Sequence, residues 1–342
     1  MTKETFLSQW TNTDNPAAQS AEISQNIFDD IREGFKIVAS LSSHVHIRKD
    51  RISSYARTLS KVTLNNVLDD DNHYRGTLEN MTAYYLILDC LNFGSGFKLH
   101  LAKEGTELKN GSIYFTASTG LKNYIEKNGV PTVQNLININ ATDIAEIFGC
   151  NINGEYSQRF ANLCVSSLRD LGTDITQKAS GSFLRYVEDM KPSAENMVKR
   201  LIEMPGFKDT HQYKGQIIPF YKRAQHNVTV LNLMFNRLGK PLFNDADQVT
   251  MFADNAVAAL LHADGLLEYS TCLQQKIENR EELPSGSEEE IEIRGCEGHV
   301  VELLSAETNM KATDIDFILW HNHTETKNSG KAPSHRTLSQ FY

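Results

Sequence analysis

Apolar residues recur at intervals of three and four along most of the chain, and this helical period constrains the fold more than any other feature. In residues 21–41, AEISQNIFDDIREGFKIVASL, one face of a helix would carry Ile23, Ile27, Ile31, Phe35 and Val38. The same period predicts further helices near residues 50–65, 78–92, 119–128, 155–170, 193–203, 220–238, 250–262, 267–278 and 288–305. The sequence therefore predicts an all-α fold that is mainly helical with few short strands.

Alternating, strand-like stretches are short and few. They occur at residues 44–47, 112–118 and 213–218, and Gly215 is expected in a hairpin turn within the last of them. The stretch LNFGSGF at 91–97 lacks a phosphate-loop lysine, so we expect a loop whose backbone closely approaches another group.

No internal repeat or low-complexity tract divides the 342 residues. We therefore expect one domain over residues 1–342, in which 20–180 form an N-terminal helical part and 181–342 carry most of the motifs.

The balance of charge argues against a polymeric partner. The chain has 34 basic and 43 acidic residues and a formal net charge of -9, which would repel a polyphosphate backbone. We therefore expect no nucleic-acid polymer as a partner.

The cysteines and the apolar runs indicate the compartment. The five cysteines never form a Cys-x-x-Cys pair, which predicts buried thiols in a reducing compartment rather than disulfides or a zinc site. No leader-like start and no run of about eighteen apolar residues occurs, so we expect no membrane contact and a cytoplasmic location.

The segment PFYKRAQ at 219–225 places two aromatic residues, two cations and an amide at the start of a predicted helix. The period puts Tyr221 toward the core, while Lys222 and Gln225 point elsewhere and Arg223 lies on the flank. Cations in a first helical turn are unfavourable by roughly 0.3–1 kcal/mol each. A bound phosphate would offset this, and an acidic neighbour or solvation of the cations would serve equally well.

The segment 243–265, FNDADQVTMFADNAVAALLHADG, carries a second unusual feature. If a helix begins near Thr250 as its N-cap, Asp254 lies on the apolar face of that helix. A buried, unpaired carboxylate costs several kcal/mol, so Asp254 needs a partner, a metal or a catalytic task. The alternative is pairing with a buried arginine or with first-turn amides, and Asp245 and Asp247 are expected to be loop and cap residues.

Other known sequence motifs give little further information about function. The sequence has no dinucleotide fingerprint, phosphate loop, nucleophile elbow or His-Glu-x-x-His motif. HNHTE at 321–325 has two histidines two positions apart without a further ligand pair, and we expect a polar loop there. No metal and no cofactor is expected.

Several segments, taken together, resemble the queuosine salvage protein family. They are LNFGSGF (91–97), GSF (181–183), FYKRAQ (220–225), FNDADQVTMFADN (243–255), EEIEIRGC (289–296) and HRTLSQFY (335–342). The resemblance runs from about Gly181 to Tyr342, and more loosely back to about Ser20. The chain departs from the family after Asp254, where many members place a proline and this chain reads Asn-Ala-Val-Ala.

The resemblance implies a fold like that of helix-hairpin-helix DNA glycosylases. It also implies hydrolysis of the N-glycosidic bond of queuosine 5′-monophosphate, with release of queuine for salvage into tRNA. Such a reaction passes through an oxocarbenium-like ribose, and a carboxylate beside the anomeric carbon can stabilise or attack it. Asp254 is the implied catalytic residue.

The resemblance also implies a binding site in which rings enclose the base and cations hold the 5′-phosphate. The implied residues are Phe93, Phe220, Tyr221 and Phe252 for the base, Lys222 and Arg223 and then His335 and Arg336 for the phosphate, and Asp245 as a further contact and second candidate carboxylate. The alternative for each aromatic residue is an ordinary place in the hydrophobic core.

Two other functions stay open. A helix-hairpin-helix glycosylase acting on DNA or tRNA would share the fold and the aspartate, but it should carry a basic stripe. A non-enzymatic protein that binds a modified nucleotide would keep the pocket and tolerate loss of Asp254.

Overall fold

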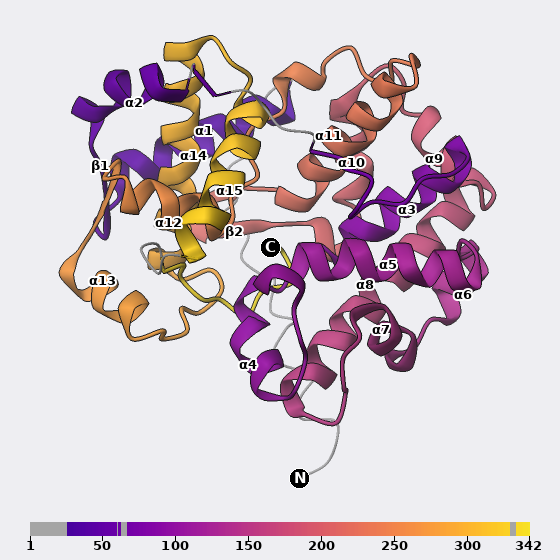
Figure 1. The fold of residues 1–342 in the computed structure, drawn as a ribbon. Helices are drawn as coiled ribbons and strands as arrows, with labels where there is room; N and C mark the ends of the chain where they lie inside the picture. The colour runs from indigo at the N-terminus through magenta and orange to yellow at the C-terminus, as the bar shows by residue number, and fades with distance from the viewer. Residues whose placement is uncertain (1–25, 60, 63–66, 329–332) are drawn as a thin grey trace.

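The computed structural model describes residues 26–59, 61–62, 67–328 and 333–342, and within them the chain is mainly helical, as predicted (Figure 1). The helices are α1 (Ile27–Leu41), α2 (Ile52–Leu59), α3 (Leu78–Leu91), α4 (Lys98–Lys103), α5 (Ile113–Asn128), α6 (Val133–Asn138), α7 (Ala141–Phe148), α8 (Glu155–Ala179), α9 (Phe183–Glu188), α10 (Ala194–Leu201), α11 (Lys222–Arg237), α12 (Ala256–Ala263), α13 (Thr271–Glu278), α14 (Glu288–Thr308) and α15 (Ala312–Asn328). No described helix has the length and apolarity needed to cross a membrane.

The described strands form two small antiparallel pairs. β1 (Val45–Ile47) pairs with β4 (Leu267–Tyr269), so the predicted strand at 44–47 is confirmed. β2 (Thr210–Tyr213) pairs with β3 (Gln216–Pro219), and Gly215 in the connecting turn has a φ of 87°, as a hairpin glycine should.

The predicted strand at 112–118 is wrong, because this stretch begins helix α5. Ser112 caps the helix by accepting a hydrogen bond from the backbone N–H of Phe115, 3.4 Å away. Ile113, Ala117 and Leu121 then recur at helical spacing and are buried. The alternation within the stretch was too short to distinguish a strand from the start of a helix.

The polar loop predicted at 321–325 is also wrong, since these residues belong to α15. That helix begins earlier and buries Ile315, Ile318 and Leu319 where it packs on α12 and α14. The apolar run before the two histidines was the signal that a helix passes through them.

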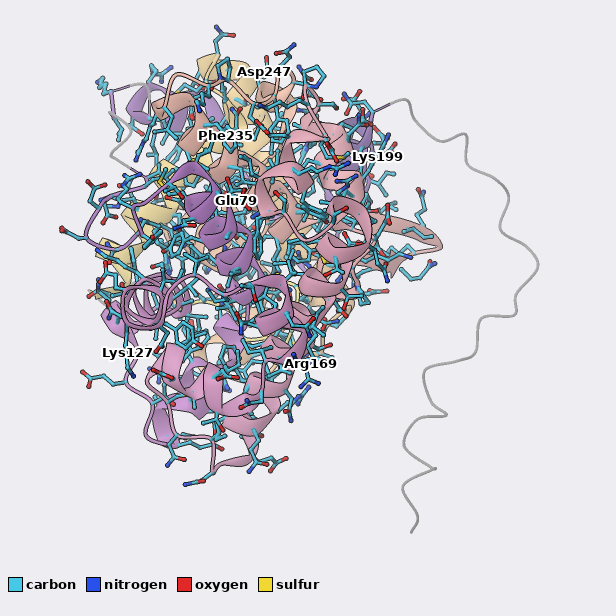
Figure 2. All side chains as sticks on the ribbon, turned by 90° about the vertical axis from the view of Figure 1, so that its right-hand side faces the viewer. Glu79, Lys127, Arg169, Lys199, Phe235 and Asp247 are labelled. Carbon is cyan, nitrogen blue, oxygen red and sulfur yellow. The ribbon has the colours of Figure 1, made fainter. Side chains whose placement is uncertain are left out.

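Parts of the chain that are far apart in sequence lie side by side. α1 packs along α14, and α3 packs against α8, α9 and α11 (Figure 1). Buried apolar residues from these helices belong to one hydrophobic cluster. Charged side chains cover the outside, for example Lys127 at the end of α5 (Figure 2). The one-domain organisation stays a prediction.

The glycine-containing stretch 91–97 approaches the C-terminal segment closely. The N–H of Gly94 donates to the backbone oxygen of Tyr342 at 2.7 Å. A Cβ on Gly96 would lie 2.1 Å from the backbone oxygen of Thr337, so a side chain at Gly96 has no room. The expected close approach is confirmed, and the group approached is the segment 335–342.

The cysteines fit the sequence analysis in part. All five are free; Cys90, Cys164 and Cys296 are buried, whereas Cys150 is half-buried and Cys272 is exposed.

Candidate functional site

A cavity of about 290 Å³ opens between the start of α11, the segment before α12, the start of α5 and helix α15. Its wall combines charged, amide and aromatic side chains. They include Asn92, Phe93, Ser95, Lys98, Tyr114, Phe115, Lys222, His226, Phe252, Asp254, Asp316, Phe317, Trp320, His321 and Tyr342. Such a mixture suits a ligand with a planar ring and polar groups.

The structure brings together four of the predicted site residues, Phe93, Lys222, Phe252 and Asp254, in this wall. The other predicted residues do not line it. These are Phe220, Tyr221, Arg223, Asp245, His335 and Arg336.

Asp254 lies just before α12 rather than on the apolar face of a helix. The helix starts at Ala256, not near Thr250, so the predicted boundary was about six residues early. Asp254 Oδ1 accepts a hydrogen bond from the N–H of Ala256 at 2.7 Å, and Oδ2 lies 3.9 Å from Lys222 Nζ. The carboxylate therefore has an amide and a cation beside it while it faces the cavity.

Side chains from α11 and α15 hold the segment that leads to Asp254. Gln225 Oε1 accepts from both the N–H and the hydroxyl of Thr250, at 2.9 Å each. Asp316 Oδ2 accepts from the N–H of Phe252 at 3.0 Å. Because its amide and hydroxyl bind Gln225, Thr250 does not cap a helix, and the segment stays non-helical up to Asp254.

Helix α14 contributes two further supports. Arg294 Nε donates to the backbone oxygen of Ala253 at 3.1 Å, and Glu297 Oε1 accepts from the N–H of Asp254 at 2.7 Å. Both side chains are completely buried. Both polar atoms of the peptide unit between Ala253 and Asp254 are thus held by buried side chains.

Arg294 also accounts for the position of Phe220 outside the cavity wall. The guanidinium lies between the rings of Phe220 and Tyr342, at 4.0 and 4.4 Å from their centroids. It donates to both carboxylate oxygens of Asp209, at 3.1 and 2.5 Å. Burial alone would raise the pKa of Asp209, but the charge of Arg294 outweighs it and the pKa lies below its ordinary value. Phe220 packs on this ion pair and lies outside the cavity wall.

Arg223 is a structural clamp rather than an open cation. Its guanidinium is buried between Phe93 and Phe207, 4.8 and 4.5 Å from their centroids. It donates hydrogen bonds of 2.8 Å to the backbone oxygens of Asp89, Gly206 and Gln340 and to Ser167 Oγ. These bonds occupy four of its five N–H donors, so Arg223 has little capacity left to bind a phosphate.

The remaining predicted residues also have structural partners. Asp245 caps α10 by accepting from Ser193 Oγ at 2.9 Å and from the N–H groups of Ala194 and Glu195 at 2.5 and 3.2 Å, as its predicted loop and cap role requires. Tyr221 is half-buried before α11 with a φ of 47°. Neither Asp245 nor Tyr221 lines the cavity.

The two C-terminal cations lie away from the cavity wall. His335 Nε2 is 3.1 Å from the hydroxyl of Tyr342, and burial lowers the pKa of His335 to about 4. Arg336 donates to the backbone oxygen of Arg280 and to Glu282, at 2.6 and 3.1 Å. Both residues therefore anchor the C-terminal segment.

Lys222 is buried and faces the cavity, contrary to the direction predicted from the helical period. Its Nζ lies 3.9 Å from Asp254 Oδ2 and 3.4 Å from Asn92 Oδ1. Burial lowers the pKa of Lys222, and the charge of Asp254 opposes that change. The acidic neighbour considered as an alternative in the sequence is therefore Asp254 itself.

A family model described as queuosine salvage protein matches residues 72–342. The chain belongs to this family. The match begins well before Gly181, so it covers most of the cavity wall as well as the C-terminal motifs.

Relatives in the family cover nearly the whole chain. A queuosine 5′-phosphate N-glycosylase/hydrolase of Dictyostelium discoideum is 32% identical over 91% of this chain and 98% of its own length. The protein of the same name in Sphaerobacter thermophilus is 31% identical over 84% of this chain and 88% of its own length. The protein of the same name in Nematostella vectensis is 26% identical over 91% of this chain and 98% of its own length.

The sequence analysis missed the aromatic side of the cavity and a buried pair beside it. Phe317 lies against Phe252, and Trp320 lies against Tyr114 and Phe115, with centroids 5.3 to 5.8 Å apart. The missed residues, Tyr114, Phe115, Phe317 and Trp320, come from α5 and α15, whose starts were not predicted.

The missed pair is Asp89 and His226, whose side chains are 2.7 Å apart. A single carboxylate within the apolar run YYLILDCL, residues 84–91, was the available signal.

Two carboxyl groups beside Asp254 have pKa values shifted toward the protonated form. Burial, followed by the negative charge of Asp254, raises the pKa of both Glu297 and Asp316 well above the ordinary range. Glu297 Oε2 is buried and has no hydrogen-bond partner among the described residues. Within the same residues, no three His, Cys, Asp or Glu side chains are grouped as metal ligands.

The raised pKa of Glu297 predicts how the free energy of unfolding depends on pH. A carboxyl with a raised pKa favours folding most below its unfolded pKa of about 4.3, and this contribution is lost as pH rises toward the folded pKa. Glu297→Gln cannot ionise and should not show this loss. Its free energy of unfolding relative to wild type should rise between about pH 5 and pH 8, by up to about 1.4 kcal/mol per pH unit.

Urea unfolding at several pH values measures this difference. The exposed Glu281→Gln variant controls for the loss of one acidic side chain. Parallel stability curves for wild type and Glu297→Gln would contradict the assignment of a proton to Glu297.

Proposed function

We propose that this protein hydrolyses the N-glycosidic bond of queuosine 5′-phosphate and releases queuine. The observation that carries the proposal is the Asp254 carboxylate, fixed at the wall of a cavity that also presents Phe252 and Phe93. Full-length relatives named for this activity support the choice of substrate.

The geometry of Asp254 suits stabilisation of a cationic ribose. As the C1′–N bond breaks, positive charge develops on the sugar, and a carboxylate held beside it needs no rearrangement to stabilise that charge. The supports of its backbone, Arg294 and Glu297, keep it in one position before substrate arrives. Water then adds to C1′, and the products are ribose 5-phosphate and queuine.

For the 5′-phosphate we propose Lys222 together with Lys98 and Ser95. All three line the cavity, and Ser95 Oγ is buried without a hydrogen-bond partner among the described residues. A phosphate oxygen would satisfy that hydroxyl, and the two ammonium groups would balance the charge.

The other proposals concern fold relationship and location. We propose a helix-hairpin-helix glycosylase-like architecture in one domain, on the strength of the family resemblance. The five free cysteines support a reducing, cytoplasmic location.

Asp254→Asn should lower kcat/KM for queuosine 5′-phosphate by at least about a hundredfold, because it removes the negative charge opposite the developing cation. Queuine released per minute, measured by mass spectrometry, reports the loss. The matched control is Asp245→Asn, which lies outside the cavity wall, leaves Ser193 as the N-cap of α10 and should stay near wild-type activity. A folded Asp254→Asn variant with near-normal turnover would remove Asp254 from the mechanism.

Lys98→Ala should weaken use of the 5′-phosphate substrate by roughly tenfold or more and leave the unphosphorylated nucleoside almost unaffected, since a charge-assisted bond contributes about 1.5–3 kcal/mol. Lys103→Ala on the same helix, exposed and outside the cavity wall, is the control. Steady-state kinetics with both substrates give the comparison, and equal losses on the two would exclude a phosphate contact.

The charge of the chain predicts selectivity for a small ligand. With a net charge of -9, the protein should gain thermal stability from queuosine 5′-phosphate or queuine but not from tRNA or duplex DNA at physiological salt. Melting temperatures with each ligand at two salt concentrations test this. Stabilisation by the polymers alone, falling steeply with salt, would favour a polynucleotide glycosylase instead.

A further inference from the structure

A buried carboxylate and an imidazole form a pair beside the cavity, with the imidazole in its wall, and the roles proposed above do not use this pair. Asp89 of α3 is completely buried, and its Oδ1 lies 2.7 Å from Nδ1 of His226 on α11. Asn92 and Asn227 each donate an amide hydrogen to the same carboxylate, at 3.0 Å. Burial alone would raise the pKa of Asp89, but the charge of His226 and these hydrogen bonds outweigh it, so Asp89 is ionised.

An ionised carboxylate fixes the orientation and the tautomer of the imidazole. Asp89 can only accept, so the proton of the 2.7 Å bond is on His226 Nδ1. The amide nitrogen of Asn92, 3.3 Å from the same atom, is also a donor and is satisfied by Asp89. Nε2 has no hydrogen-bond partner among the described residues, and His226 lines the cavity. Nε2 is therefore the ring nitrogen available to a ligand.

His226 lies among the aromatic rings of the cavity. Its ring meets Phe252 edge-on at 5.1 Å and Tyr114 at 5.7 Å. These rings are the surfaces on which a planar base would stack, and Phe252 is two residues from Asp254. A base stacked there would lie beside His226, with Asp254 in the same cavity wall.

We propose that His226, oriented by Asp89, is the proton donor to the departing base. This inference rests on the proposed hydrolysis of queuosine 5′-phosphate. When the C1′–N bond breaks, its electron pair goes to the base, and the proton on Nε2 of the imidazolium transfers to a nitrogen of that base. Water supplies the oxygen that bonds to C1′, and a proton lost by that water restores the imidazolium.

The chemistry of the leaving group makes such a donor valuable. The 7-deazapurine of queuine has no N7 that could be protonated before the bond breaks, so the negative charge must be neutralised as it forms. Asp89 stabilises the imidazolium between turnovers and is a positioning residue that does not touch the base.

Asp316 is the rival donor, because it also lines the cavity and carries a proton. Its Oδ2 already accepts the N–H of Phe252, and burial and the charge of Asp254 oppose its ionisation more strongly than the charge of Lys222 favours it. His226 Nδ1 is instead 2.7 Å from the ionised carboxylate of Asp89. The geometry therefore favours His226.

The test compares two leaving groups on the same sugar phosphate. Queuosine 5′-phosphate needs a proton on its base, whereas 4-nitrophenyl β-D-ribofuranoside 5-phosphate releases a stable nitrophenolate without one. We expect His226→Gln to lower kcat/KM by about a hundredfold or more for the nucleotide and by less than about fivefold for the nitrophenyl probe. Asp89→Asn should show the same selectivity to a smaller degree, and Asp254→Asn should lower both activities.

Circular dichroism and melting temperature establish that each variant is folded, and His226→Gln decides the matter if Asp89→Asn does not fold. Equal losses on both substrates in His226→Gln would mean that the residue only shapes the cavity and would overturn the proposal. A selective loss in Asp316→Asn, with none in His226→Gln, would assign the proton to Asp316. Failure of the proposed function is a separate result, because wild-type protein would then release no queuine.

Discussion

The buried ion pair of Arg294 and Asp209 is the interaction on which the candidate site depends. It joins α14 to the segment before β2, with Phe220 and Tyr342 on the two faces of the guanidinium. The same guanidinium holds the backbone oxygen of Ala253, one residue before Asp254. Removing one member of a buried ion pair leaves the other charge unpaired and destabilises the folded state by about 3–5 kcal/mol. This pair therefore fixes the position of the Asp254 carboxylate as well as the fold around it.

Around this anchor, burial divides the acidic side chains into two groups. Asp209 and Asp89 have cationic partners and amide donors, and they stay ionised without water. Glu297 and Asp316 each accept one backbone N–H but have no ion-pair partner among the described residues, and burial and the charge of Asp254 raise their pKa values. Neutral carboxyl groups can support the backbone next to Asp254 without adding a third and fourth negative charge beside it. Arrangements of this kind are costly for stability alone and are characteristic of functional sites.

The helical period predicted the long amphipathic helices well, because a helix with one buried face records that face in its sequence. It failed where burial is not one-sided. The first turns of α11 are buried all round, so Lys222, Arg223 and Gln225 point into the protein although the pattern placed none of them on the core-facing stripe. Some of their partners, such as Asp89 and Thr250, are 25 or more residues away in sequence, and no local rule identifies those. Asp254 was found because a carboxylate in an apolar segment needs an explanation wherever the helix starts.

The segment FYKRAQ therefore does not work as one binding motif. Phe220 covers Arg294, Arg223 joins α3 to the C-terminal segment, and Gln225 holds Thr250. Within it only Lys222 lines the cavity, and the next residue after the motif, His226, lines it too. Because each neighbour binds a different part of the chain, the motif places Lys222 and His226 relative to Asp254 with little freedom. In this family motif, more residues hold the site together than line its cavity.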